Sequence, residues 1–216
     1  FDGPGINPGK WTFETGDGTA YGLPAGWGNN EKQIYTDSED NAHIAMVDGE
    51  SALVITANED GAGGYTSAKL TTNGHHSIRF GRIDVRAKMP EGQGLWPAIW
   101  MLGKNKDLID WPGCGEIDIS EVLGHETSRL NSTLHFTNGE NSHEEIKNIH
   151  DLPSGSFNEG YHVFGLEWTP ESLVFTLDGN QLNQVPIEDD MKEFLRSFYL
   201  ILNVAVGGNL PGDPEI

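Results

Sequence analysis

The chain has 216 residues, with 13 basic and 33 acidic side chains and a formal net charge of −20 at pH 7. This charge disfavours nucleic acid, anionic membranes and sulfated polysaccharides as partners, because all of these carry negative charge themselves. The length suits one domain with a sizeable core, and the single cysteine, Cys114, excludes an internal disulfide.

The opening segment, residues 1–31, is rich in glycine and proline and has no sustained hydrophobic period, which predicts loops bordering a site. Within it, the run GWGNNE at residues 26–31 contains Asn29 and Asn30. Their amides can both donate to and accept from sugar hydroxyls. From the residues alone, an asparagine turn is at least as good an interpretation.

Short strands are predicted next, at residues 43–47 and 52–57 with a turn between them, at 65–72, and at 80–89. Apolar and polar side chains alternate in the last of these, and Arg82 and Arg86 lie on its polar face. Arginines on such a face usually pair with carboxylates. Contact with a substrate is the alternative, which we retain for Arg86.

Two tryptophans mark the following strand. Trp96 and Trp100 lie four residues apart, so on a strand both emerge on the face of Ala98, while Ile99 and Met101 point to the core. Because the second face already supplies core residues, we favour a platform on which the C–H face of a sugar stacks over burial of both indoles.

The run GEIDISE at residues 115–121 has the pattern of an active site. On a regular strand Glu116, Asp118 and Ser120 share one face and the isoleucines pack behind them, but Glu121 points the other way. Two carboxyls about 5 Å apart would suit a retaining glycosidase.

We therefore predict a β-bulge near Ile119 or Ser120, which would turn Glu121 to the face of the other two acids. Cys114, just before this run, has no partner base in the sequence and is predicted to be a small buried residue.

Three of the histidines that follow the acidic run are considered as candidates for a site. His135 shares a face with Asn131 and Thr133 on a strand at residues 131–136, where a lone histidine is more often structural than catalytic. His143 and His150 show no metal-ligand spacing and are predicted to be surface residues.

The last part of the chain predicts strands at residues 161–168, 173–177 and 199–206, with one short helical stretch at 191–197. Asn203 interrupts the apolar final strand. When buried it needs a hydrogen bond, either from the backbone or from a substrate hydroxyl. Many short strands between glycine and asparagine turns predict an all-β sandwich.

Together these motifs resemble the laminarinase-like glycoside hydrolases of family sixteen, whose signature is Glu, any, Asp, any, any, Glu on a bulged strand. The segments that carry the resemblance, in the family's order, are GWGNNE at 26–31, GLWPAIW at 94–100, Cys114, the acidic run, TLHF at 133–136 and NVAVGG at 203–208. The resemblance implies one catalytic domain over residues 1–216. Its fold would be a β-jelly-roll sandwich of two curved antiparallel sheets, concanavalin A-like, with a concave cleft for the substrate.

The activity that the resemblance implies is endo-acting, retaining hydrolysis of β-1,3-glucan such as laminarin. Glu116 would be the nucleophile, and Glu121, kept protonated by neighbouring charge and partial burial, the acid and then the base. Asp118 would orient Glu116. The resemblance also places His135 beside the acid/base and Asn29 or Asn30 near bound sugar. The other candidate substrate contacts are Trp96, Trp100, Asn203 and Arg86.

No cofactor is needed for this chemistry. The chain opens in the middle of the family's opening segment and stops where relatives continue to a last strand. We therefore expect part of the terminal strands, and the usual ligands of a structural calcium ion, to be missing. We also expect a secreted monomer whose signal peptide is not in this chain, with Leu210 where relatives often have a sugar-stacking tryptophan.

Other interpretations stay open. A mixed-linkage β-1,3-1,4-glucanase often has one residue fewer between the glutamates, and a neutral galactan hydrolase is less favoured still. A noncatalytic β-glucan-recognition module would have lost the acidic pair, whereas this chain keeps all three carboxylates. A calcium site or a solvated strand at the acidic run fits poorly with the alternating isoleucines and flanking tryptophans.

Overall fold

A computed structural model of the chain describes residues 1 and 3–215. Part of the terminal strands was expected to be missing at the two ends of the chain. Of the end segments, Asp2 and Ile216 lie outside the described residues. No helix in the described part of the chain is long and apolar enough to cross a membrane.

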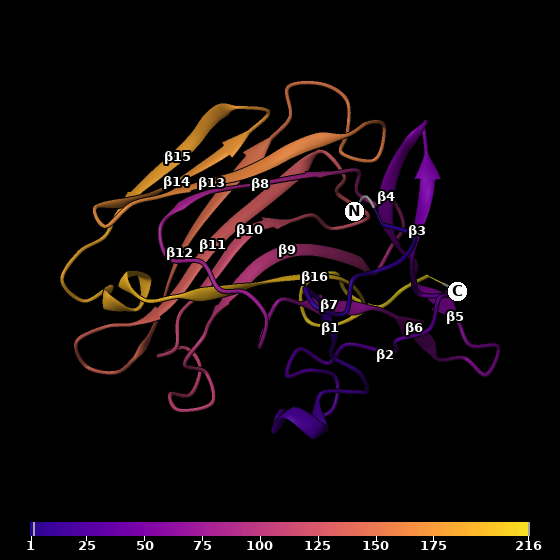
Figure 1. Ribbon diagram of the computed structural model, residues 1–216, viewed down its shortest axis with the longest axis horizontal. Helices are drawn as coiled ribbons and strands as arrows, with labels where there is room; N and C mark the ends of the chain where they lie inside the picture. Colours follow the sequence, from indigo (N-terminus) through magenta and orange to yellow (C-terminus); the bar gives the residue numbers. More distant parts are fainter. Residues whose placement is uncertain (2, 216) are drawn as a thin grey trace.

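Two antiparallel sheets form the body of the molecule (Figure 1). The larger has the strand order β1 (Thr12–Phe13), β7 (Lys69–Thr71), β16 (Phe198–Val206), β9 (Leu95–Gly103), β10 (Glu116–Glu121), β11 (Arg129–Thr137) and β12 (His143–Asp151). The smaller has the order β15 (Asn180–Pro186), β14 (Ser172–Leu177), β13 (His162–Trp168) and β8 (Gly81–Ala87). The predicted all-β sandwich is confirmed.

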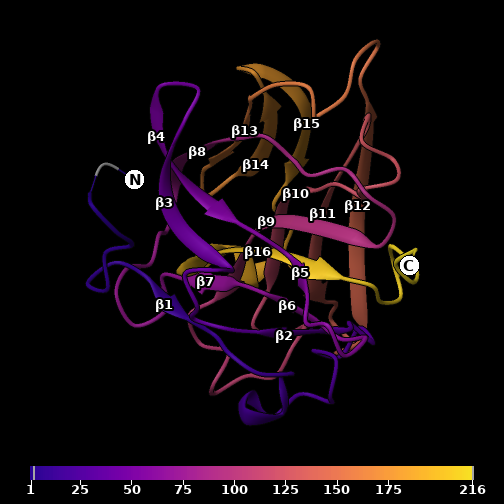
Figure 2. The same ribbon diagram turned by 90° about the vertical axis from the view of Figure 1, so that its right-hand side faces the viewer.

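Smaller elements cover the end of the sandwich that holds β1 and β7 (Figure 2). They are a hairpin of β3 (Ala42–Val47) and β4 (Glu50–Ile55) and a small sheet in the order β2 (Gln33–Tyr35), β6 (Tyr65–Ser67), β5 (Asn58–Glu59). The single strand predicted at residues 65–72 is therefore two strands, β6 and β7, that belong to different sheets. They are separated by the fully buried Ala68.

Helical structure is limited to two short 3₁₀ turns among the described residues, η1 (Thr19–Tyr21) and η2 (Lys192–Leu195). The second lies within the helical stretch predicted at 191–197, and the first was not predicted. Strand β12 was also missed. It is the edge strand of the larger sheet, and its side chains are exposed or half-buried throughout, so it lacks the apolar alternation that marks a strand.

The core lies between the two sheets. From the larger sheet, Ile99, Met101 and Ile117 are 0–4% exposed, and they share one hydrophobic cluster with Phe164 and Leu166 of β13. Each such side chain contributes about 1.5–3 kcal/mol by leaving water. Because side chains alternate along a strand, this packing turns the intervening residues of β9 and β10 to the opposite, outer face of the larger sheet.

Candidate active site

A β-bulge in β10 brings the third carboxylate to the outer face of the larger sheet. Against β9, Asp118 lies opposite Trp100 and Glu121 opposite Ala98, so three steps along β10 match two steps along β9. The register also shifts against β11 over the same residues. The predicted bulge is confirmed, and it places Glu121 on the face of Asp118.

Ser120 does not share that face, and this part of the prediction is wrong. The serine lies opposite the core residue Ile99 and is fully buried, with no hydrogen-bond partner for its hydroxyl. The reason is that the bulge begins directly after Asp118, so the alternation is already broken at Ser120.

The start of β10 is fixed by Gly115. Its φ is +84°, and a Cβ atom there would lie 2.7 Å from Cζ of Phe198 and 2.8 Å from Cβ of Glu193. A larger residue would have neither the conformation nor the space, so glycine directly before Glu116 sets where the acidic strand begins.

A cleft of about 600 Å³ lies along the outer face of the larger sheet. The predicted site residues that line it are Glu116, Asp118, Glu121, His135, Trp96, Trp100, Asn29 and Asn203. They come from four strands and one loop, so the fold brings together side chains spread over most of the sequence.

Two predicted substrate contacts lie elsewhere. Arg86 belongs to β8 in the other sheet, where its Nη1 donates to Oε2 of Glu50 at 2.6 Å and its guanidinium lies 4.1 Å from the ring centre of Tyr161. The contact with substrate that was retained as the alternative for Arg86 is therefore wrong, and pairing with a carboxylate, the favoured interpretation, is confirmed. Asn30 is exposed and donates to Oδ1 of Asn209 at 2.7 Å instead of lining the cleft.

The three carboxyls of β10 are close enough to influence one another. Burial raises the pKa of Glu116 well above its ordinary value, and the charge of Asp118 raises it further. Burial also raises the pKa of Asp118 well above its ordinary value, and the charge of Glu121 adds to this effect. Carboxyls coupled in this way give up their protons one after another, so the site can supply both an acid and a base.

Glu121 is held differently from the other two acids. Burial raises its pKa, but the indole Nε1 of Trp96 donates to its Oε1 at 3.0 Å and favours the charged form, as does the positive charge of Lys147. The raised pKa expected for Glu121 is thus confirmed, but it is shared with Glu116 and Asp118, which the sequence did not predict.

His135 lies against the carboxylates. Its Nε2 is 3.3 Å from Oδ2 of Asp118 and 3.8 Å from Oε1 of Glu116. The strand register explains this, because Glu116 pairs directly with His135 across β10 and β11. The imidazole can therefore restrain Asp118, and it lies close to Glu116 as well.

Asn203 joins the two sides of a polar network at the cleft floor. Its Oδ1 accepts from Nε1 of Trp100 at 2.7 Å, and its Nδ2 donates to the hydroxyl of Tyr35 at 3.0 Å. The partners in the structure are therefore side chains and not the backbone, and contact of Asn203 with a substrate hydroxyl stays a prediction. The network holds the Trp100 ring in the cleft wall.

A buried ion pair beneath the cleft was not predicted. Nζ of Lys69 lies 2.9 Å from Oε2 of Glu14, and the two side chains are only 8% and 10% exposed. The ammonium also lies 4.1 Å from the ring centre of Trp27 and 5.0 Å from that of Trp100. The available signal was a lysine between Ala68 and Leu70, the one charged residue in the predicted strand at 65–72.

Cys114 is buried and has no disulfide partner, as predicted. Burial raises the pKa of its thiol to about 11, and the charge of Glu116 adds to this effect. The cysteine is therefore a poor nucleophile at neutral pH.

At the rim of the cleft, His143 and Glu145 of β12 lie beside His135. Nδ1 of His135 is 2.9 Å from Nε2 of His143 and 3.9 Å from Oε2 of Glu145. His143 is exposed, as predicted, but its contact with His135 was missed because β12 itself was missed. Trp111 lies over both imidazoles.

Two groups of side chains among the described residues have the spacing to hold a metal ion. One consists of Glu116, Asp118 and His135, and the other of His135, His143 and Glu145. The first coincides with the proposed catalytic residues, and the second lies at the cleft rim.

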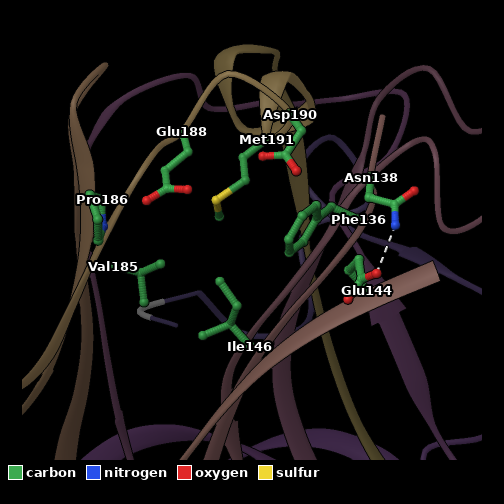
Figure 3. Close-up of a pocket in the computed structure, with 9 residues that line it drawn as sticks. All are labelled: Phe136, Asn138, Glu144, Ile146, Val185, Pro186, Glu188, Asp190 and Met191. Atoms are coloured by element: carbon green, nitrogen blue, oxygen red, sulfur yellow. Dashed lines mark hydrogen bonds between the residues drawn. The ribbon is translucent and has the colours of Figure 1, made fainter. Parts of the chain in front are cut away.

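A second cavity, of about 340 Å³, lies between the edge strands of the two sheets (Figure 3). Apolar side chains such as Phe136, Ile146 and Met191 line it together with acidic groups such as Glu144 and Glu188. None of the predicted site residues lines it, so we place the candidate active site in the larger cleft.

Comparisons with known proteins show which family the chain is similar to. The sequence profile described as "Glycosyl hydrolases family 16" matches residues 28–214. A glucan endo-1,3-beta-glucosidase of Cryptopygus antarcticus is 34% identical, over 95% of this chain and 79% of its own length. Glucan endo-1,3-beta-glucosidase A1 of Niallia circulans is 33% identical over 98% of this chain, which spans only 33% of that larger protein.

Among solved structures, the laminarinase catalytic domain of Thermotoga maritima is 41% identical, with a TM-score of 0.83 over 100% of this chain and 87% of that one. This likeness and the two packed antiparallel sheets confirm the predicted β-jelly-roll sandwich.

Proposed function

The chain belongs to family 16 of the glycosyl hydrolases, and from this we propose that it hydrolyses internal β-1,3-glucosidic bonds of a laminarin-type β-glucan with retention of configuration. The observation that carries the proposal is the bulge in β10, because it sets Glu116, Asp118 and Glu121 on one face of the cleft. A regular strand would turn Glu121 into the core.

In the first step, the Glu116 carboxylate attacks the anomeric carbon while Glu121 gives its proton to the departing glycosidic oxygen. The glycosidic bond breaks and an ester between the sugar and Glu116 forms. Esterification removes the charge of Glu116, so Glu121 can then take a proton from water. The resulting hydroxide displaces Glu116, which leaves as the carboxylate.

Asp118 and His135 help to position the nucleophile, Glu116. The His135 Nε2 contact with Asp118 and the half-buried setting of Glu116 hold the attacking oxygen in place. Fixing a reacting group in this way removes part of the entropic barrier of the reaction.

Two features favour a neutral polymer cut in its interior. The side chains that line the cleft include more carboxylates than lysines, so an anionic polysaccharide would be repelled. The reacting carboxylates lie on β10, with lining residues on β7, β9 and β16 to one side and on β11 and β12 to the other. A glucan chain can therefore continue past the cleavage point in both directions.

Aromatic side chains supply surfaces for sugar rings. Trp96 and Trp100 line the cleft as the spacing predicted, and Trp111 and Tyr21 add rings that are 50% and 39% exposed. Leu210 also lines the cleft, and we propose that it replaces a distal stacking contact. A protein that only binds β-glucan and does not cleave it would not need the three carboxyls of Glu116, Asp118 and Glu121 in this cleft.

We further propose that the enzyme acts as a monomer outside the cell, where an intact polysaccharide can reach it. The two-carboxylate chemistry requires no cofactor.

The test is release of reducing ends from laminarin by the parent chain, by Glu116→Gln and by Glu50→Gln. The last is a matched control, because Glu50 lies in β4 beside Arg86 and away from the cleft. We expect release by the parent and by Glu50→Gln, with Glu116→Gln reduced at least about a thousandfold. A folded parent chain that releases nothing from laminarin would refute the proposal. Release from mixed-linkage glucan or agarose instead would reassign the substrate.

A further inference from the structure

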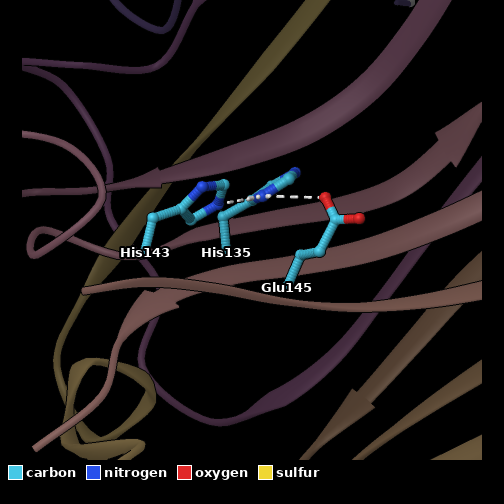
Figure 4. Close-up of side chains that lie close together, drawn as sticks. All are labelled: His135, His143 and Glu145. Atoms are coloured by element: carbon cyan, nitrogen blue, oxygen red, sulfur yellow. Dashed lines mark hydrogen bonds and ion pairs between the residues drawn. The ribbon is translucent and has the colours of Figure 1, made fainter.

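We propose that His135, His143 and Glu145 form a binding site for a divalent transition-metal ion such as Zn²⁺, and that the bound ion inhibits the enzyme. Figure 4 shows the three side chains converging from neighbouring strands at the cleft rim. The binding part of the proposal stands on this geometry alone, and the inhibition part rests on the proposed hydrolase function.

The strand pairing creates the site. His135 of β11 lies directly opposite Glu145 of β12, and His143 lies two residues before Glu145, on the same face of the edge strand. The nearest ligand atoms are Nδ1 of His135 and Nε2 of His143, 2.9 Å apart, and all three ligand atoms lie within 4.8 Å of one another. Tetrahedral zinc needs ligand atoms roughly 3.3 Å apart, so small side-chain rotations suffice.

The donor set selects the kind of ion. Two imidazole nitrogens and one carboxylate suit Zn²⁺, Cu²⁺ or Ni²⁺, whereas Ca²⁺ and Mg²⁺ prefer oxygen ligands only. Three protein ligands leave one coordination position for water. The site would thus be open on the solvent side.

The surroundings of His135 also match a metal ligand. An ion on Nδ1 leaves the proton of the ring on Nε2, which faces Oδ2 of Asp118 at 3.3 Å. Metal-bound histidines usually donate this second N–H to a carboxylate, which fixes the ring orientation. Asp118 is already in place to accept it.

Trp111 limits the movement of both imidazoles. Its ring centre lies 5.7 Å from that of His135 and 4.7 Å from that of His143. His143 and Glu145 are exposed, so an ion can reach them from solvent, and the net charge of −20 attracts cations to the protein.

Occupancy would act on the cleft in two ways. The ion would restrain His135, whose Nε2 contacts Asp118 and Glu116, and it would hold Glu145, which lines the cleft, in a new position. Both changes alter the wall against which a glucan must fit. We therefore expect bound metal to reduce hydrolysis.

The binding experiment uses the whole chain without a histidine tag, freed of metal with chelator. Co²⁺ is the probe, because its visible absorption reports tetrahedral coordination, and Zn²⁺ is added in competition. The parent should bind one ion per chain. His143→Ala and Glu145→Gln should bind at least about tenfold more weakly. His150→Ala, on the same strand opposite Leu130, is the matched control and should bind like the parent.

The same variants are then assayed on laminarin, each compared with its own metal-free rate. Zn²⁺ that saturates the parent should inhibit the parent and His150→Ala, while His143→Ala should need at least about ten times more. Binding that does not depend on His143, including binding by Glu116, Asp118 and His135 alone, would overturn the site. Binding without inhibition would overturn the coupling to the cleft.

The two failures can be told apart. A chain that shows no hydrolysis in chelator would refute the proposed function, and the Co²⁺ titration would still decide the metal site.

Discussion

The indole Nε1 of Trp96 donates a hydrogen bond of 3.0 Å to Oε1 of Glu121. The bond favours the ionised carboxylate, against the burial that raises the pKa of Glu121. Trp96 is thus more than a stacking surface, because it influences the pH at which the proposed acid loses its proton.

We predict that Trp96→Phe moves the alkaline limb of the kcat/KM profile to higher pH. Without the N–H donor the ionised form of Glu121 loses a stabilising contact, so its pKa rises and the acid stays protonated longer. Loss of a hydrogen bond to a charged group should move the limb by roughly one pH unit.

The control is Trp100→Phe, which also removes an indole from the cleft but whose N–H goes to Asn203. It should leave the limb where it is. An equal displacement of the limb in both variants, or none in Trp96→Phe, would contradict a direct effect of Trp96 on Glu121.

Glu121→Gln should lose activity according to the leaving group. On laminarin, whose glycosidic oxygen needs a proton, we expect kcat to fall by about 10²–10⁴. On an aryl β-glucoside oligomer with an acidic phenol, formation of the covalent intermediate should be nearly unaffected, and the intermediate should accumulate. Burst kinetics measure this, and equal losses of the first step on both substrates would remove Glu121 from the role of acid.

Glu116→Gln should stabilise the fold, and more so as pH rises. Burial raises the pKa of Glu116 above its unfolded value, so its contribution to stability is fully present below about pH 4 and is lost as pH rises through the folded pKa. Glutamine has no such loss. The gain in free energy of unfolding should grow as pH rises above about 4, by about 1.4 kcal/mol for each pH unit over which the folded chain keeps this proton and the unfolded chain does not.

Urea unfolding of parent and variant at several pH values measures this gain. The parallel variant Glu50→Gln changes an exposed carboxylate in β4 and should show no comparable trend. A gain from Glu116→Gln that is constant or shrinks with pH would show that burial does not raise the pKa of Glu116 in the folded chain.

Lys69→Met should destabilise the protein by about 3–5 kcal/mol, because it leaves the carboxylate of Glu14 buried without its partner. The double variant Lys69→Met/Glu14→Gln removes both charges and should regain most of this loss. Denaturant titration compares the variants. A single variant that costs less than about 1 kcal/mol would mean that Glu14 finds water or another partner.

The sequence predicted those parts of the site that follow from alternation along one strand. Trp96 and Trp100 were predicted to lie on the outer face because Ile99, between them in the sequence, points to the core. The bulge was predicted because Glu121 lies beside Asp118 only if the strand contains one extra residue. Its effect on Ser120 was missed, because the position of an extra residue depends on pairing with β9 and not on the strand itself.

Contacts between distant segments could not be predicted in this way. Lys69 meets Glu14 across 55 positions only because β7 pairs with β1. Contact with substrate was retained as an alternative for Arg86 because it lies on a polar strand face, but whether that face borders the cleft depends on which sheet the strand joins. Strand β12 lacks the apolar alternation that marks a strand. The contacts of His143 and Glu145 with His135 therefore follow only from its pairing with β11.

Cleavage of β-1,3-glucan by double displacement at the carboxylates of β10 is the central claim. Proton NMR of the first products of laminarin hydrolysis, recorded before mutarotation, tests it most directly. We predict that the new reducing ends appear first as the β-anomer and only later equilibrate. New ends that appear first as the α-anomer would show single displacement by water and would contradict the covalent role of Glu116.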